Sequence, residues 1–336
     1  MIDLNQNEMT APCAAAWEGT SCNRSMIYDL AGAAASDRLI FTSSGAEGVN
    51  QVFLSVFLEV VRKAGKTHIL ISEMEDAPTM RCAKRLEELG CTIKIAPVKK
   101  GLIDVDALSK LISPRTALIS VTMAHGLTGV IQPAREILDL AKERQVLLHF
   151  DAMYAIGKYP MQFESDYLTF SGDRIHSTKG TGGLFAKQSA PLVPLILGGA
   201  EQAGLRSGSL DESALSQAAH QSLLYLDTMA LEVARLRDLF ESSIQGKVLF
   251  QEHLRLPNTS LIAFPGVHQE ALLYFLHRKG VAAAIGGSYA PHLSTLDETA
   301  LSFSFSRMTT EEEVVRAAQI INETVQELRR LSEALC

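Results

Sequence analysis

Apolar stretches of strand length alternate with amphipathic stretches of helix length between residues 38 and 186, and this alternation limits the folds open to the chain. THILISE and VLLHFDA are apolar almost throughout, whereas a segment such as APTMRCAKRLEELG repeats its apolar residues at helical spacing. Strands that are apolar on both faces belong to sheets covered by helices on both sides, and such sheets are mostly parallel. The sequence therefore predicts an α/β protein with a mainly parallel central sheet.

The pattern changes after a long helical stretch at residues 211–244. Beyond it, VLFQEH, NTSLIAF, VAAAIGG and ALSFSFS are typical of strands, and HQEALLYFLHRKG and the segment that begins at TTEEEVV are typical of helices. This order favours a small α+β unit. We predict a large domain over residues 11–240 and a small domain formed by residues 1–10 and 241–336.

Composition and charge exclude several classes of function. Hydrophobic residues make up 47% of the 336 residues, which is enough for a globular core. The net charge of −7, without a Lys/Arg cluster, argues against nucleic-acid binding, and no apolar run has the length of about 20 residues that spans a membrane. The polar N-terminus does not resemble a signal peptide, and the five cysteines lack CxxC spacing, as expected of free thiols. We predict a cytoplasmic protein.

Polar and glycine-rich segments follow the predicted strands, where sites in parallel sheets lie. These segments are TSSGAEG, SEMEDAP, MAHGLTG, FDAMY and SGDR. TSSGAEG also places backbone N–H groups at a helix N-terminus, which can bind an anion. His125 and His176 lie near strand ends too, and we expect them to be hydrogen-bonded or exposed residues rather than metal ligands.

These segments, taken in order, resemble the motifs of the cysteine desulfurases of the class V aminotransferase group, which carry pyridoxal phosphate (PLP). FTSSGAEGVN resembles the family's FTSGATESNN, and TALISVTMAHGLTGVIQP resembles TxLVSVMxVNNETGVIQP. LHFDAMYAIGKYPM, LTFSGDRIHSTKGTGGLF and LGGAEQAGLRSGSL continue the match. The resemblance implies PLP fold-type I, a large domain with a small C-terminal α+β domain, and a homodimer with the cleft at the subunit interface.

The resemblance also places candidate cofactor contacts on this chain. Asp151 matches the acid that pairs with the pyridine nitrogen, although an acid at a strand end can also cap a helix or pair with a cation. Ser171 matches the strand-end hydroxyl, and Ser209 stands where a threonine reaches across the dimer interface. Gly45 and Ala46 lie in the phosphate-binding turn. Arg206 is a candidate for substrate binding.

Other positions depart from the family. Arg174 falls on the lysine that forms the Schiff base, and a guanidinium cannot lose its proton near neutral pH. Asp76 falls on the stacking histidine and Asp173 on a histidine that resembles a phosphate ligand. Ala46 removes a phosphate hydroxyl. Further family positions carry Gly126, Tyr154 and Ser302. We expect Arg174 to bind an anion or to pair with Asp173, Asp76 or Asp151.

Two further observations indicate a degenerate family member. The loop IGGSYAPHLSTL around Tyr289 should carry the sulfur-accepting cysteine, yet the chain has no cysteine between Cys91 and Cys336. Lys179 matches a different family lysine, so it does not replace the one missing at position 174. These losses predict that PLP is not covalently bound, and is held non-covalently or not at all.

Three hypotheses about function follow. The first is a catalytically inactive protein that acts through contacts with other proteins, such as a desulfurase or an iron–sulfur scaffold protein. The second is a binder of a small anion or metabolite in the remodelled cleft. The third is a divergent PLP-dependent enzyme.

Overall fold

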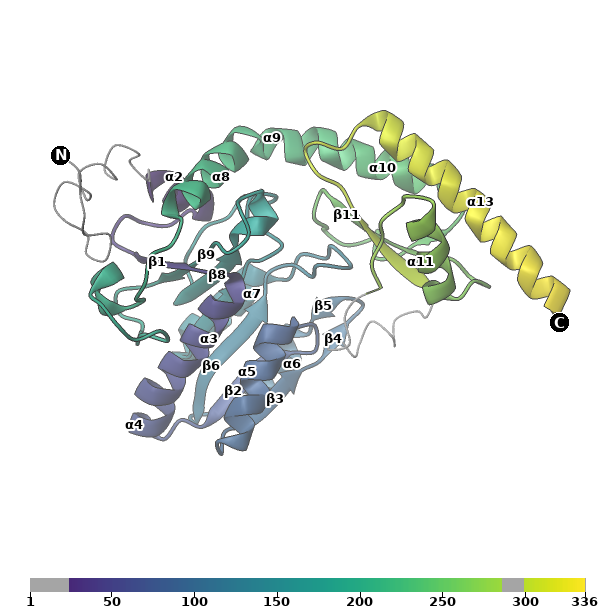
Figure 1. The fold of residues 1–336 in the computed structure, drawn as a ribbon. Helices are drawn as coiled ribbons and strands as arrows, with labels where there is room; N and C mark the ends of the chain where they lie inside the picture. Colours follow the sequence, from purple (N-terminus) through teal and green to yellow (C-terminus); the bar gives the residue numbers. More distant parts are fainter. Residues whose placement is uncertain (1–23, 286–298, 336) are drawn as a thin grey trace, which may run out of the picture.

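A seven-stranded sheet forms the centre of the large unit in the computed structural model, which describes residues 24–285 and 299–335 (Figure 1). The strand order is β1-β9-β8-β7-β6-β2-β3. All neighbours from β3 to β8 are parallel, and β9 is antiparallel to both β8 and β1. The strands are β1 Arg38–Thr42, β2 His68–Ser72, β3 Thr92–Ala96, β6 Thr116–Thr122, β7 Leu147–Asp151, β8 Tyr167–Ser171 and β9 Gly182–Ala186. The predicted mainly parallel sheet is confirmed.

Helices cover both faces of this sheet. Successive residues of one strand enter different apolar clusters, because Ile69 and Ile71 pack in one and Leu70 packs in the other. One cluster includes residues of α3 Gly45–Val56 and α5 Ala77–Glu88. The other includes residues of α2 Arg24–Ala31, α6 Val105–Leu111, α7 Ala134–Arg144 and α8 Glu212–Leu224. Burial on both faces explains why the strand segments are apolar throughout.

Short elements complete the large unit. They are the π-helical η1 Phe57–Val61, α4 Arg62–Ala64, the hairpin β4 Val98–Lys99 and β5 Leu102–Ile103, and the 3-10 helices η2 Gly172–Ile175 and η3 Glu201–Gly204. Of these, η2 matters most for the site, because it follows directly on β8 and carries Arg174.

A helical segment leads from the large unit to a small one. The helix expected at 211–244 is divided into α8, α9 Leu226–Thr228, π-helical η4 Met229–Val233 and α10 Ala234–Ser243. In the small unit, β10 Lys247–Val248, β11 Thr259–Ala263 and β12 Ala300–Ser304 form an antiparallel sheet. α11 Gln269–Arg278 and α13 Glu311–Leu335 pack beside it, with Phe240 of α10 in the same core (Figure 1). The predicted small α+β unit is confirmed.

Some predicted elements differ from the structure. VLFQEH contributes a single strand residue, Val248, and the described part of VAAAIGG makes a single bridge, Ala284 to Ser302. Helix α2 was not predicted from the sequence. Residues 1–10, assigned to the small domain, lie outside the described residues, so the domain boundaries stay a prediction. Within the described ranges, no helix combines the length and apolar character needed to cross a bilayer.

Candidate functional site

Three acids, Glu75, Asp76 and Asp151, lie at the carboxyl edge of the sheet, where β2 and β7 end. Glu75 Oε1 accepts hydrogen bonds from Ser72 Oγ at 2.5 Å and from the Thr122 N–H at 3.1 Å. Asp151 Oδ1 accepts from the Met153 N–H at 3.0 Å. Glu75 Oε2 and Asp151 Oδ2 are buried and have no hydrogen-bond partner among the described residues. Two carboxyl oxygens therefore lie in the protein interior without solvent or donor.

Burial changes the protonation of these acids. It raises the pKa of Glu75 to about 8, that of Asp151 to about 7 and that of Asp76 to about 6. Asp76 raises the pKa of Asp151 further by charge repulsion, and Arg174 opposes the shift at Asp76. Asp151 caps a turn through Met153 and makes no ion pair with a described cation. The acids therefore carry less negative charge than three carboxylates would.

The turn before α3, where a phosphate site was predicted, is organised by Glu47. Ser44 Oγ accepts from the Glu47 N–H at 3.3 Å, and the Ser43 N–H donates to the Glu47 carboxylate at 2.7 Å. Gly45 lies against the β8 backbone, since a Cβ there would be 3.3 Å from the carbonyl carbon of Phe170. Ala46 supplies no hydroxyl. The Ser43 N–H of this turn is therefore already bonded to a carboxylate of the chain itself, that of Glu47.

Arg206 pairs with that carboxylate. Its Nε donates to Glu47 Oε1 at 3.0 Å, and its Nη1 donates to the carbonyls of Ser207 and Gly208 at 3.0 and 2.9 Å. Burial would raise the pKa of Glu47, but the hydrogen bonds from Arg206 and Ser43 outweigh it and the pKa is lowered. Arg206 thus joins α3 to the segment after η3. Its suggested contact with substrate stays a prediction.

Arg174 does not form the predicted ion pair. Its guanidinium lies over the Tyr154 ring, 5.0 Å from the centroid, and no described acid is within ion-pair distance. The Tyr154 ring packs on Gly126, where an added Cβ would lie 2.3 Å from a ring carbon. The expected pairing with Asp173, Asp76 or Asp151 is therefore wrong. The guanidinium lies over an aromatic face instead, where a cation–π contact takes the place of an ion pair.

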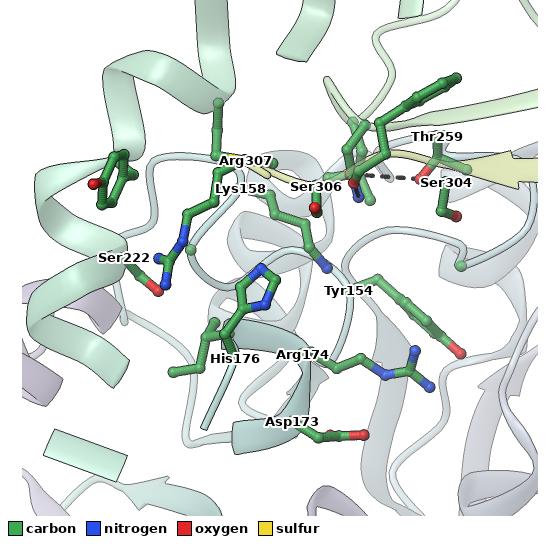
Figure 2. A pocket seen from close by; sticks show the side chains of 18 of the residues that line it. Tyr154, Lys158, Asp173, Arg174, His176, Ser222, Thr259, Ser304, Ser306 and Arg307 are labelled. Atoms are coloured by element: carbon green, nitrogen blue, oxygen red, sulfur yellow. Dashed lines mark hydrogen bonds between the residues drawn. The ribbon is translucent and has the colours of Figure 1, made fainter. Parts of the chain in front are cut away.

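A cavity of about 380 Å³ lies between the large and small units. Figure 2 shows Lys158, His176 and Arg307 pointing into it, with Arg174 and Tyr154 on one side. The large unit also contributes residues 126–127 and part of α8, and the small unit contributes residues 256–259 and 302–307. The cavity is therefore built from segments that are far apart in the sequence.

Three cations line this cavity without an acidic partner. The charged groups of Lys158, Arg174 and Arg307 make no hydrogen bond or ion pair with a described residue. Arg307 lies over the Tyr225 ring at 4.9 Å. Asp173 is the one acid in the lining. The cavity consequently has an excess of positive charge.

The positive charge also affects the basic groups themselves. Burial, and after it the charge of the neighbouring Arg174, lower the pKa of Lys158 to about 8 against the opposite effect of Asp173. Burial, Arg307 and Lys158 together lower the pKa of His176. An anion bound here would replace the missing counter-charge.

Five of the positions at which the sequence departs from the family line this cavity, whereas the departures at Ala46 and Asp76 lie outside it. Gly126, Tyr154, Asp173, Arg174 and Ser302 are lining residues. Ser302 Oγ donates to the Leu127 carbonyl at 2.8 Å and so links the two units. The predicted contacts outside the lining are Asp151, Ser171, Ser209, Gly45, Ala46 and Arg206.

Two lining residues, Lys158 and Arg307, have no role assigned from the sequence, although Lys158 lies in the matched segment LHFDAMYAIGKYPM. His125 is buried, its Nδ1 accepts from the Thr128 N–H at 3.2 Å, and burial lowers its pKa to about 4. His176 is exposed to the cavity. His125 is therefore hydrogen-bonded and His176 is exposed, as expected from the sequence.

Known proteins resemble this chain in sequence and in fold. Residues 6–221 match the family described as aminotransferase class-V. A cysteine desulfurase of Nostoc sp. is 32% identical over 334 residues, with 92% of this chain and 82% of that protein covered. The cysteine desulfurase NifS of Azotobacter vinelandii is 30% identical with the same shares covered. A solved NifS-like protein superposes with a TM-score of 0.87 at 26% identity, over 95% of this chain and 90% of that one.

The fold is that of the PLP-dependent transferases of fold-type I. The chain belongs to the aminotransferase class-V family and is a homologue of its cysteine desulfurases.

This family implies PLP, and the residues present fit it only in part. The buried Asp151 Oδ2, which lacks a partner, fits a protonated pyridine nitrogen. Asp76 offers no π face for stacking on the ring. Arg174 offers no amine, and the hydroxyl of the phosphate turn is absent at Ala46. The nitrogen contact is therefore present without the groups that would hold the rest of the cofactor.

Proposed function

We propose that this chain is a divergent cysteine desulfurase homologue that binds a small anionic metabolite in the cavity between its two units. The observation that carries the proposal is the set of three cations, Lys158, Arg174 and Arg307, that share one cavity without an acidic partner among the described residues. Like charges that share one cavity repel one another, and a bound anion would offset this repulsion.

The size and lining of the cavity support a small ligand. A volume of about 380 Å³ lies at the lower end of the range of about 300–1,000 Å³ that small-molecule sites occupy. The two guanidinium groups can each bind a carboxylate or phosphate with two parallel hydrogen bonds. Serine side chains at positions 222, 304 and 306 add hydroxyls to the lining. A compound with one or two acidic groups fits this chemistry.

The same residues argue against PLP held covalently at position 174. A guanidinium stays protonated near neutral pH and cannot condense with an aldehyde. The chain also has no cysteine between Cys91 and Cys336, so the position expected to accept sulfur lacks a thiol. We therefore propose that sulfur transfer from cysteine is not its activity.

Calorimetric titration of the purified protein with succinate and with inorganic phosphate tests the proposal. We expect saturable binding that Arg307→Met weakens about tenfold or more, as the loss of charge-assisted hydrogen bonds predicts. Arg278→Met is a matched control, because Arg278 also lies over a tyrosine ring, 5.9 Å from the Tyr274 centroid, but outside the cavity. Absence of binding by every anion, or equal loss in both variants, would refute the anion site.

A second candidate is a divergent PLP-dependent enzyme. The similarity to cysteine desulfurases over 92% of the chain and the unpartnered Asp151 Oδ2 both favour it over an inactive protein. The same titration with PLP, followed by borohydride and peptide mapping, separates the two candidates. PLP trapped on a lysine, together with an amino-acid-dependent activity, would support the enzyme. PLP that is removed completely by desalting would leave the metabolite site.

Protein contacts are a further proposal. The family resemblance is the reason to expect a homodimer and a contact with a desulfurase or an iron–sulfur scaffold protein. Two adjacent exposed apolar residues, Ile196 and Leu197, and the exposed Ser209 lie on the segment that precedes α8. They offer a surface where a second copy of the chain could pack.

A further inference from the structure

Lys158 is the lysine among the described lining residues of the cavity between the two units. Its ammonium group points into the cavity and has no hydrogen-bond or ion-pair partner among the described residues (Figure 2). Several lysines instead pair with acids, namely Lys63, Lys99, Lys142, Lys187 and Lys279. Asp173 influences Lys158 only from beyond ion-pair distance. The Lys158 ammonium group therefore stabilises the described part of the chain through no hydrogen bond or ion pair.

The backbone holds this amine in place. Gly157 has φ +68°, and a Cβ there would lie 2.8 Å from Ile175 and 3.2 Å from Ser222. The turn around it therefore packs tightly between η2 and α8. The Lys158 N–H also donates to the Ala155 carbonyl at 3.1 Å. These contacts direct the side chain toward Arg174 and His176 rather than toward solvent.

The electrostatic environment makes the amine reactive. Burial and the charge of Arg174 lower the pKa of Lys158 to about 8. At pH 7 about a tenth of the molecules then carry the neutral amine, about two orders of magnitude more than for an ordinary lysine. Desolvation beside another cation is a known way to activate a lysine nucleophile. Lys179, by contrast, is exposed and is not among the lining residues.

We propose that Lys158 condenses with a small 2-oxo acid that binds in the cavity through its carboxylate. This inference rests on the anion site proposed above and names the class of its ligand. Arg174 and Arg307 lie on different sides of Lys158, so either guanidinium can receive the carboxylate while the carbonyl carbon faces Nζ (Figure 2). The ligand would occupy the space between the two units.

The chemistry balances without a redox partner. The lone pair of the neutral Nζ forms a bond to the carbonyl carbon, and the carbonyl oxygen takes up a proton. The nitrogen gives up its two protons, and the oxygen takes up a second one. The hydroxyl then leaves as water, and a C=N bond remains. The net change is an amine plus a carbonyl giving an imine plus water. His176 lies beside Lys158, where its imidazole can carry protons from the nitrogen to the departing oxygen.

Reductive trapping with pyruvate tests this assignment. The whole protein is incubated at pH 7 with pyruvate and cyanoborohydride, and the product is analysed by intact mass and peptide mapping. We expect one reduced pyruvate adduct on Lys158, formed at least about tenfold faster than adducts on surface lysines because more of its amine is neutral. Succinate, which has no reactive ketone, should slow the reaction by occupying the site.

Two variants separate this inference from the anion site. Lys158→Arg cannot form an imine, so the adduct should be lost, and succinate binding to the unmodified protein reports separately on the anion site. Lys179→Met is the control and should trap pyruvate as the unmodified protein does. Succinate binding without an adduct on Lys158, or an adduct that persists in Lys158→Arg, would overturn the role of Lys158 alone. Failure of both succinate and pyruvate to bind would overturn the anion site as well.

Discussion

At the scale of single residues, the buried acids at the edge of the sheet link the protein's stability to pH. The folded-state pKa values of Glu75, Asp76 and Asp151 lie above those of the free side chains, because burial disfavours the charged form. The folded protein therefore holds protons that the unfolded chain releases. The contribution of these three acids to stability is fully present at low pH. It is lost as the pH rises from about 4 through their folded-state pKa values.

Glu75→Gln should reduce this dependence. Urea unfolding of the unmodified protein should show a free energy of unfolding that declines between pH 5 and pH 8 by an amount on the order of a few kcal/mol, since one pKa unit corresponds to about 1.4 kcal/mol. The variant should decline less, because its amide does not titrate. Glu88→Gln, at an exposed position, is the control and should keep the full slope. An unchanged slope in Glu75→Gln would contradict the assignment.

At the scale of elements, the packing of β9 against β8 depends on a glycine. Gly183 faces Phe41 of β1 and Phe170 of β8, and a Cβ at this glycine would lie 2.4 Å from carbons of the Phe170 ring. The two neighbouring strands leave the backbone little room to move. The close contact between glycine and ring therefore determines how β8 and β9 pack.

Gly183→Ala should destabilise the protein by about 1–3 kcal/mol, the usual range for overpacking a core. Equilibrium urea unfolding would measure the loss. Phe170→Leu removes the ring, so the double variant should lose less free energy of unfolding than the sum of the single variants. Strictly additive losses would show that the contact between Gly183 and Phe170 is not the source of the strain.

At the scale of the whole molecule, the proposed homodimer would cover the apolar residues before α8. Leu197 is 81% exposed, and a pair of chains that meet there would bury it. We expect light scattering to give twice the monomer mass, and Leu197→Asp to raise the dissociation constant about tenfold or more. Leu254→Asp is the control, since Leu254 is 63% exposed in the small unit. A monomer at high protein concentration would refute the dimer.

The two units also meet through few hydrogen bonds that cross the cavity region, of which the bond from Ser302 Oγ to the Leu127 carbonyl at 2.8 Å is one. A ligand that contacts Arg174 on one side and Arg307 on the other would add further links. The units enclose the proposed site together, so neither unit alone contains it.

Much of the architecture followed from residue patterns. The apolar strands and amphipathic helices predicted the layered sheet, because burial on both faces imposes that pattern on a local stretch of sequence. Helix α2 was not predicted because its eight residues are fewer than the 11–18 over which helical spacing is recognised. The helix at 211–244 was predicted as continuous, whereas the structure has an irregular backbone at Tyr225 and a π-helical segment after it.

The sequence by itself determined the family, the layered fold and the lack of an amine at position 174, because each is written in local pattern or residue identity. Only the tertiary structure decided the partner of Arg174, the desolvation of Lys158 and the existence of the shared cavity. Lys158 and Arg307 are far apart in the chain and meet only when the small unit packs on the large one. Burial and charge at such a site depend on contacts between distant segments, which no local pattern records.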